Sequence, residues 1–186
     1  RTDGFVGEKS HAIGNLQGKG PVLNSIGGIY FDQEDFVTAN EYWEKALNIA
    51  RKINDGSQIG TFLNNIGAAY LNMGKRREGM RYYLEAIKEN QLRGLTQALA
   101  VNYLNLAMLE MDDGNFDSAD SFCLKSETIY KNSGDVYGQV SVLNHRARIQ
   151  VERKNYREAV KLYKKAIDGL RAMNSPVMLR TTLQEA

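Results

Sequence analysis

The chain has 186 residues, of which 42% are hydrophobic and 25% charged, and its formal net charge at pH 7 is +2. So small a charge gives no electrostatic sign of a nucleic-acid or acidic-lipid partner. No apolar run approaches the ~20 residues that a membrane-spanning helix needs, so we expect no direct membrane insertion. Cys123 is the only cysteine, which excludes an intrachain disulfide and leaves the compartment open.

A unit of forty residues repeats along the chain. Residues 23–30 read LNSIGGIY, and residues 63–70 read LNNIGAAY. The same classes of residue recur in register at further positions, which are apolar (Ile26, Ile66, Leu106), small (Gly27, Gly67, Ala107, Ala147 and Ala39, Gly79, Ala119, Ala159) or aromatic apart from one cysteine (Trp43, Tyr83, Cys123, Tyr163). A fixed period of this length predicts a solenoid or a propeller.

The copies divide the chain in order. Residues 1–19 match the end of a preceding copy, because Ile13 is in register with an isoleucine of the first copy. The four complete copies that follow are residues 20–59, 60–99, 100–139 and 140–179. Residues 180–186 match the start of a fifth copy, with Leu183 at the position of the leucine that opens the first octet. We therefore expect the whole chain to be a single solenoid fragment of a longer array.

Each complete copy has the pattern of two helices. In the second copy, Leu63 and Ile66 belong to one apolar stripe with three- and four-residue spacing, and Tyr83 and Ile87 belong to another. This spacing predicts helices and not strands. Between the stripes, Gly74 can adopt the left-handed conformation that ends a helix. The sequence therefore predicts an all-α fold of antiparallel helix pairs.

The small residue at the position of Gly67 predicts a close contact between helices. Glycine inside a helix is less favourable than alanine by roughly 1 kcal/mol. Its recurrence as glycine or alanine indicates a point where two helix backbones approach too closely for a larger side chain.

This repeat resembles the tetratricopeptide repeat, whose pattern is W-x2-L-G-x2-Y, then A-x3-F, then P. The first copy supplies Leu23, Ile26, Gly27, Tyr30, Ala39 and Trp43. The family's proline is absent, and its place is taken by Arg51, Gln91, Lys131 and Arg171. Without that stop the second helix can continue, which accounts for a repeat longer than the usual 34 residues. The resemblance implies a right-handed α-α superhelix. Arrays of this repeat length resemble those of kinesin light chain, spindle-orientation adaptors and bacterial sensor proteins.

Two departures from the pattern concern charge. Glu110 and Gln150 stand at the position of a tyrosine, and Arg146 stands where the other copies are apolar. Burying an unpaired arginine is expensive, so either its stem packs while its head reaches water or the fourth copy packs less regularly. The third copy is acidic (Asp112, Asp113, Asp117, Asp120) and the fourth is basic (Arg153, Lys154, Arg157, Lys161, Lys164, Lys165). We interpret these as solvated helix faces, with a docking patch as the alternative.

The sequence contains no motif of an enzyme or of a cofactor site. The histidines are His11 and His145 alone, which are too few and too far apart for a metal site of ordinary spacing. Cys123 falls on an aromatic core position of its repeat, so we expect a buried, inert thiol rather than a nucleophile. We expect a non-catalytic protein with no cofactor and no metal.

The resemblance also implies which residues bind a ligand. In this family the first helix of each repeat lines a concave groove, and the peptide-contacting positions include the fifth, sixth and ninth of a repeat. Carried over to this chain, these positions give Asn24, Asn64, Asn65, Asn105, Asn144, His145 and Arg148.

An asparagine side chain has one acceptor and two donors, so it can pair with a peptide C=O and N–H together. Repeated along the groove, such residues would hold an extended chain. The alternative is that they only join neighbouring helices. Five hydrogen bonds contribute about 5 kcal/mol against an association cost of ~4–15 kcal/mol, so apolar anchors must help. The candidate anchors are Phe31, Leu71, Met108, Met111 and Val151, each of which could equally be packing between repeats.

We therefore expect a non-catalytic scaffold that binds a protein or an extended peptide segment. By family analogy, it is the sensor or regulatory arm of a larger signalling protein. Such an arm is either cytoplasmic or the extracytoplasmic part of a bacterial membrane sensor. The alternative is a structural spacer or a dimerisation arm, which forms a homodimer and has no ligand in the groove.

Overall fold

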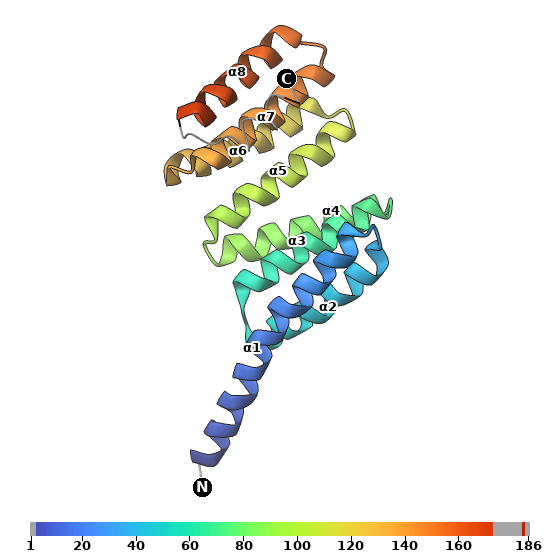
Figure 1. Cartoon of the computed structure of the whole chain (residues 1–186), viewed down its shortest axis with the longest axis vertical. Helices are drawn as coiled ribbons and strands as arrows, with labels where there is room; N and C mark the ends of the chain where they lie inside the picture. Colours follow the sequence, from blue (N-terminus) through green and yellow to red (C-terminus); the bar gives the residue numbers. More distant parts are fainter. Residues whose placement is uncertain (1–2, 173–183, 185–186) are drawn as a thin grey trace. The chain divides into compact units, whose positions relative to one another are not determined.

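The computed structural model describes residues 3–172 and 184, and this part of the chain is all-α (Figure 1). The helices in chain order are α1 (Asp3–Asp32), α2 (Phe36–Ile53), α3 (Gly56–Asn72), α4 (Arg76–Leu92), α5 (Thr96–Asp112), α6 (Phe116–Ser133), α7 (Val136–Glu152) and α8 (Tyr156–Ala172). No strand occurs among the described residues. The predicted fold class is therefore confirmed, and each complete copy is a pair of helices.

We call the first helix of each copy helix A (α1, α3, α5, α7) and the second helix B (α2, α4, α6, α8). In the later copies helix A begins four residues before the first residue that the repeat pattern assigns to the copy: α3, for example, begins at Gly56 and not at residue 60. Its start is set by Asp55, whose side chain accepts a hydrogen bond from the Gln58 backbone N–H at 3.1 Å. Such a cap satisfies one of the backbone N–H groups that have no partner within the helix at its start.

Helix α1 runs without interruption from Asp3 to Asp32 and extends beyond the end of its hairpin partner α2 (Figure 1). Residues 3–19 therefore lie in the same helix as the first helix A. That residues 1–19 end an earlier copy stays a prediction. The predicted start of a fifth copy at residues 180–186, including Leu183, lies outside the described residues apart from Gln184.

The turns contain one left-handed residue every twenty residues. These residues are Glu34, Asn54, Gly74, Gly94, Gly114, Gly134 and Lys154, with φ between 56° and 76°. The role that we predict for Gly74 is confirmed by its φ of 72°. Glycine adopts this conformation freely, whereas a side chain with a Cβ is strained there. The same sharp turn thus connects A to B and B to the next A, whatever residue occupies it.

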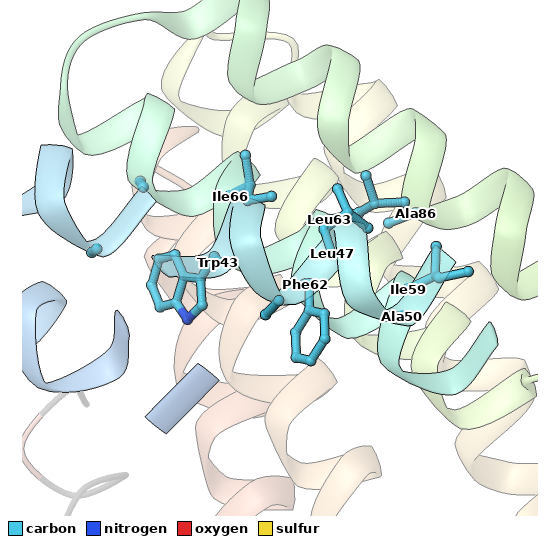
Figure 2. Packing of buried hydrophobic residues seen from close by; sticks show 11 residues of the cluster. Trp43, Leu47, Ala50, Ile59, Phe62, Leu63, Ile66 and Ala86 are labelled. Atoms are coloured by element: carbon cyan, nitrogen blue, oxygen red, sulfur yellow. The ribbon is translucent and has the colours of Figure 1, made fainter. Parts of the chain in front are cut away.

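Backbone contacts divide the chain into two compact units, residues 1–98 and 99–186. In the first unit, helices α2 and α3 enclose the core (Figure 2). Trp43 and Leu47 of α2 pack there with Phe62, Leu63 and Ile66 of α3, and all five side chains are buried. In the second unit, α5, α6 and α7 contribute to a corresponding cluster that contains Ala107, Ala119, Cys123, Val142 and Ile149.

Gly67 confirms the predicted close approach of two helix backbones. A Cβ added to it would lie 3.2 Å from the backbone oxygen of Gly79 on α4 and 2.7 Å from Cδ1 of Tyr83. Tyr83 is itself buried, so its ring has no open space into which it can move. The small residues of the repeat therefore set the distance between helix A and helix B.

Replacing Glu34 or Lys154 by glycine should stabilise the protein. A left-handed conformation is unfavourable for a residue with a Cβ by ~1–2 kcal/mol. Glycine removes this strain, but it also stabilises the unfolded chain by ~0.4–1 kcal/mol through its greater conformational entropy. We expect urea denaturation to show a gain of about 0.5–1 kcal/mol for Glu34→Gly and Lys154→Gly. Asn54→Gly is the matched control and should gain less, because asparagine tolerates this conformation. A loss of stability in the first two variants would contradict the strain.

Gly67→Ala and Gly28→Ala should shift stability in opposite directions. Both glycines lie inside helices A, but a Cβ at Gly28 meets no atom within 4 Å. We expect Gly28→Ala to gain about 1 kcal/mol from helix propensity. Gly67→Ala should lose about 1–2 kcal/mol, because overpacking exceeds that gain. Thermal and urea unfolding of the two variants check this, and equal shifts would mean that Gly67 does not set the helix spacing.

Candidate functional site

The seven residues implied by the family resemblance all lie on helices A and are all half-buried. In the first unit these are Asn24 on α1, and Asn64 and Asn65 on α3. In the second unit they are Asn105 on α5, and Asn144, His145 and Arg148 on α7. Each unit therefore presents amide side chains from its helices A at the edge of its core.

In the first unit the structure brings two of these asparagines together. The Asn65 Nδ2 group on α3 donates to Oδ1 of Asn24 on α1 at 2.8 Å. The backbone oxygen of Asn24 accepts a hydrogen bond from Nε1 of Trp43 at 3.1 Å, which ties the same residue to α2. For this pair, the alternative reading that the asparagines join neighbouring helices describes what the structure shows.

The pairing uses one acceptor of Asn24 and one donor of Asn65. A primary amide has two N–H donors and a carbonyl acceptor, so further donors stay on Asn24 and the carbonyl stays on Asn65. Because the pair fixes both side chains, those groups point in set directions. A donor on one helix A and an acceptor on the next have the chemistry that an extended peptide backbone needs.

In the second unit, a narrow crevice lies between α5 and α7. Its walls include Met108 and Met111 from α5, and His145 and Arg148 from α7. It has no room for a water molecule. Two predicted apolar anchors and two predicted polar contacts therefore meet at one place on the same unit.

His145 has a defined orientation at this crevice. Its Nδ1 lies 2.7 Å from the backbone oxygen of Ser141, one turn earlier on α7. A carbonyl oxygen can only accept, so Nδ1 carries the hydrogen, and Nε2 is the acceptor nitrogen of the neutral ring. This contact fixes which ring nitrogen faces away from α7.

The other anchor candidates are placed differently. The Phe31 ring lies 5.2 Å from that of Phe36 and 5.5 Å from that of Trp43, so it packs inside the first hairpin. Leu71 borders Gly79 on α4 and likewise packs within its hairpin. For both residues the packing alternative describes their position. Val151 is exposed on α7.

The charged residues of the second unit pair with one another. Nε of Arg146 donates to Oδ1 of Asp120 at 2.7 Å, and its Nη1 donates to Oε2 of Glu127 at 3.3 Å. Arg153 at the end of α7 pairs with Asp117 on α6. The acidic third copy and the basic fourth copy are thus joined in part by ion pairs between α6 and α7. The sequence predicted for Arg146 either a packed stem with its head in water or a less regular fourth copy, and neither arrangement includes such a pair.

An open pocket of about 880 Å³ lies beside the turn from α5 to α6, where the sequence predicted no site. Its lining includes Glu110, Phe116, Asp117 and Arg153. In the first two copies a tyrosine stands at the position of Glu110 and stacks on a tyrosine of helix B, with ring centroids 5.5 and 5.3 Å apart. The signal that could have located the pocket is therefore the replacement of that tyrosine by Glu110.

Cys123 has the environment of an inert thiol. Its side chain is 0% exposed, and burial, with a smaller contribution from the Asp120 charge, raises its pKa to about 12. A nucleophilic cysteine needs a lowered pKa and access to solvent. Within residues 3–172 and 184, no three acidic, histidine or cysteine side chains gather as a metal site would require. In the same part of the chain, no helix has the length and apolarity to cross a membrane.

Comparison with known families and structures gives matches of one kind. Two family models, both described as Tetratricopeptide repeat, match residues 60–89 and 98–172, together more than half of the chain. The Rap conjugation gene regulator of the plasmid pLS20, solved in complex with the Phr* peptide, matches with a TM-score of 0.74 at 16% identity, over 84% of this chain and 43% of that one.

Two other solved structures show a similar likeness in fold. The apo form of the quorum sensor NprR from B. thuringiensis matches with a TM-score of 0.72 at 18% identity, over 94% of this chain and 50% of that one. The STAND protein PH0952 from Pyrococcus horikoshii has a tetratricopeptide repeat sensor. It matches with a TM-score of 0.73 at 21% identity, over 92% of this chain and 28% of that one. The chain thus spans half or less of each of these three proteins, and at such identity the likeness shows the fold. Curated protein sequences give no match.

The Asn24–Asn65 contact should be measurable as a coupling between two helices A. We expect a double-mutant cycle with Asn24→Ala and Asn65→Ala to give a coupling of about 1 kcal/mol in urea denaturation, the usual net value of one hydrogen bond. Asn48→Ala, at an exposed position on α2, is the control and should not couple to Asn65→Ala. Purely additive losses would mean that the two amides do not hold α1 to α3.

Proposed function

The chain belongs to the tetratricopeptide-repeat family, and on this basis we propose that it is a non-catalytic scaffold whose helices A bind a protein or an extended peptide segment. The observation that supports this most directly is the placement of half-buried amide side chains at corresponding positions on successive helices A. The similar Rap regulator was solved with a bound peptide, which is the same class of ligand.

Each unit by itself offers groups that would hold such a segment. In the first unit, the Asn24–Asn65 pair offers donors and an acceptor to a peptide backbone. In the second unit, Met108 and Met111 offer apolar contact next to Arg148. Backbone hydrogen bonds are indifferent to the ligand's side chains, whereas the methionine surface adapts to different apolar residues. In the first unit the amides would fix the direction of a bound segment. In the second unit Met108 and Met111, at the edge of the narrow crevice, would contact an apolar residue next to an acceptor or an acidic group.

We further propose that the scaffold is the sensor or regulatory arm of a larger signalling protein. NprR is a quorum sensor, and PH0952 carries its tetratricopeptide repeats as a sensor. The ligand would then be a signalling peptide or a segment of a partner protein, and the output would come from another part of the protein.

A spacer or dimerisation arm is the second candidate, and one observation favours it. Val22 and Ile29 on α1 are 59% and 57% exposed, although the corresponding Phe62 and Ala69 on α3 are buried. In α3 the same face packs on α2, so the stripe on α1 would suit contact with a helix of a preceding repeat or of a second molecule. This candidate requires no ligand on the helices A.

Removal of the amides should weaken capture of a partner. We would compare wild-type protein with the Asn24→Ala, Asn64→Ala, Asn65→Ala, Asn105→Ala variant on a resin exposed to source lysate. A captured partner would then be divided into short overlapping peptides, and the affinity of each would be measured by fluorescence anisotropy. We expect one extended segment to bind wild-type protein, and the variant to lose at least tenfold in affinity, because several hydrogen bonds of about 1 kcal/mol each are removed.

The matched control replaces Asn48 and Asn132, which are exposed asparagines on helices B. Asn48→Ala, Asn132→Ala should bind like wild-type protein, and circular dichroism should show that all variants are folded. Equal binding by the amide variant and the wild type would exclude the helix A amides as the site. If neither the wild-type protein nor the amide variant captures a partner, the result would favour the spacer or dimerisation arm.

A further inference from the structure

One contact between repeats in the second unit is built from charges at positions that are mainly apolar in the first unit. Where α2 packs on α3, the residues at these positions are Asn40, Leu47 and Ile66, and both Leu47 and Ile66 are buried in the core. Two copies of forty residues later, α6 packs on α7, and the residues at the same three positions are Asp120, Glu127 and Arg146. All three positions thus carry a charge in the second contact and none in the first.

The three residues form one ion-pair cluster. Nε of Arg146 lies 2.7 Å from Asp120 Oδ1, and its Nη1 lies 3.3 Å from Glu127 Oε2. Lys131, one turn after Glu127, approaches its other oxygen at 2.7 Å. The side chains of Arg146, Asp120 and Glu127 are 24%, 25% and 16% exposed. The contact between α6 and α7 therefore has charged groups that are paired but within reach of water.

These two kinds of contact respond differently when the helices separate. Opening the contact at Leu47 and Ile66 exposes hydrocarbon to water, which is unfavourable in proportion to the area exposed. Opening the contact at Arg146 returns three charged groups to a solvent that hydrates them, so much of the lost attraction is regained as hydration. At these three positions the second contact therefore resists separation less than the first, although α6 and α7 also share buried apolar residues such as Cys123 and Val142.

The crevice of the proposed binding site lies across the same division. Met108 and Met111 belong to the hairpin α5–α6, whereas His145 and Arg148 belong to the hairpin α7–α8. If α7 moves away from α6, the two walls of the crevice separate. The ion-pair cluster and the crevice therefore both lie between the same two hairpins.

We propose that the Asp120–Glu127–Arg146 cluster is a hinge at which the hairpin α7–α8 opens from α5–α6 and dismantles the crevice between α5 and α7. The hinge itself depends only on the contact between α6 and α7. Its regulatory meaning rests on the proposed function, because the crevice matters only if a ligand contacts its walls. The closed crevice is too narrow to admit a side chain, so a segment that lies across the outer edges of both walls would hold the hinge closed.

Hydrogen exchange measured by mass spectrometry tests the hinge without any ligand. The decisive variant carries the residues of the first contact: Asp120→Asn, Glu127→Leu, Arg146→Ile. The comparison is between this variant and wild-type protein at the same peptides, so that differences in opening between one hairpin and another cancel. We expect exchange of the protected amides of α7 and α8 to slow about tenfold or more in the variant, with α2 and α3 unchanged.

Two further variants complete the experiment. Arg146→Ile alone leaves Asp120 and Glu127 close together without the guanidinium, and should speed exchange in α7 and α8. Arg153→Ala removes the more exposed ion pair with Asp117 and should leave exchange in α7 and α8 within about twofold of wild type. This control separates the hinge from a general effect of charge in the second unit.

The proposal is overturned if the triple variant exchanges at the wild-type rate or faster, or if it fails to fold. Either result would mean that the two contacts are not interchangeable. The result is independent of partner capture: a failed hinge leaves the amide site standing, and a failed amide site leaves the exchange data unaffected.

Discussion

Close contact between helix A and helix B is the constraint on which the rest of each repeat depends. Gly67 and Gly79 face each other so closely that neither has room for a Cβ. Because that contact fixes the spacing of the hairpin, the neighbouring positions must carry residues of set size. The aromatic at Trp43 or Tyr83 fills the space beside the small pair. The repeated octet is therefore the sequence of one helix A that must satisfy the same contact in each copy.

Departures from that register account for the distinctive features of the second unit. Glu110 removes a tyrosine that would stack on helix B, and an open pocket lies at that place. Arg146 stands where the other copies have an apolar core residue, and two carboxylates of α6 pair with it. A repeat array conserves its geometry through small residues and turns, so it can vary the chemistry of one contact without altering its neighbours.

The sequence predicted what repeats and failed where partners are distant. Helix pairs and the turn at Gly74 could be predicted because local spacing and one glycine determine them. Asn24 was placed correctly on a helix A, but its hydrogen bond with Asn65 depends on the distance between two helices, which no local pattern contains. The sequence marks Arg146 as costly to bury, but its partners lie 26 and 19 residues away on another helix, and no local pattern connects them. Comparing all three positions across copies would have revealed them.

The pairing of Asn24 with Asn65 also limits what the amides can contribute to binding. A side chain held in place loses little entropy when a ligand arrives, but it makes fewer new hydrogen bonds than a free amide. Each new bond replaces one to water, so its net value is about 1 kcal/mol. The amides therefore favour one direction of a bound segment more than they strengthen binding. Affinity must come from apolar burial. In the second unit Met108 and Met111 supply the apolar surface, and their crevice lies across the proposed hinge.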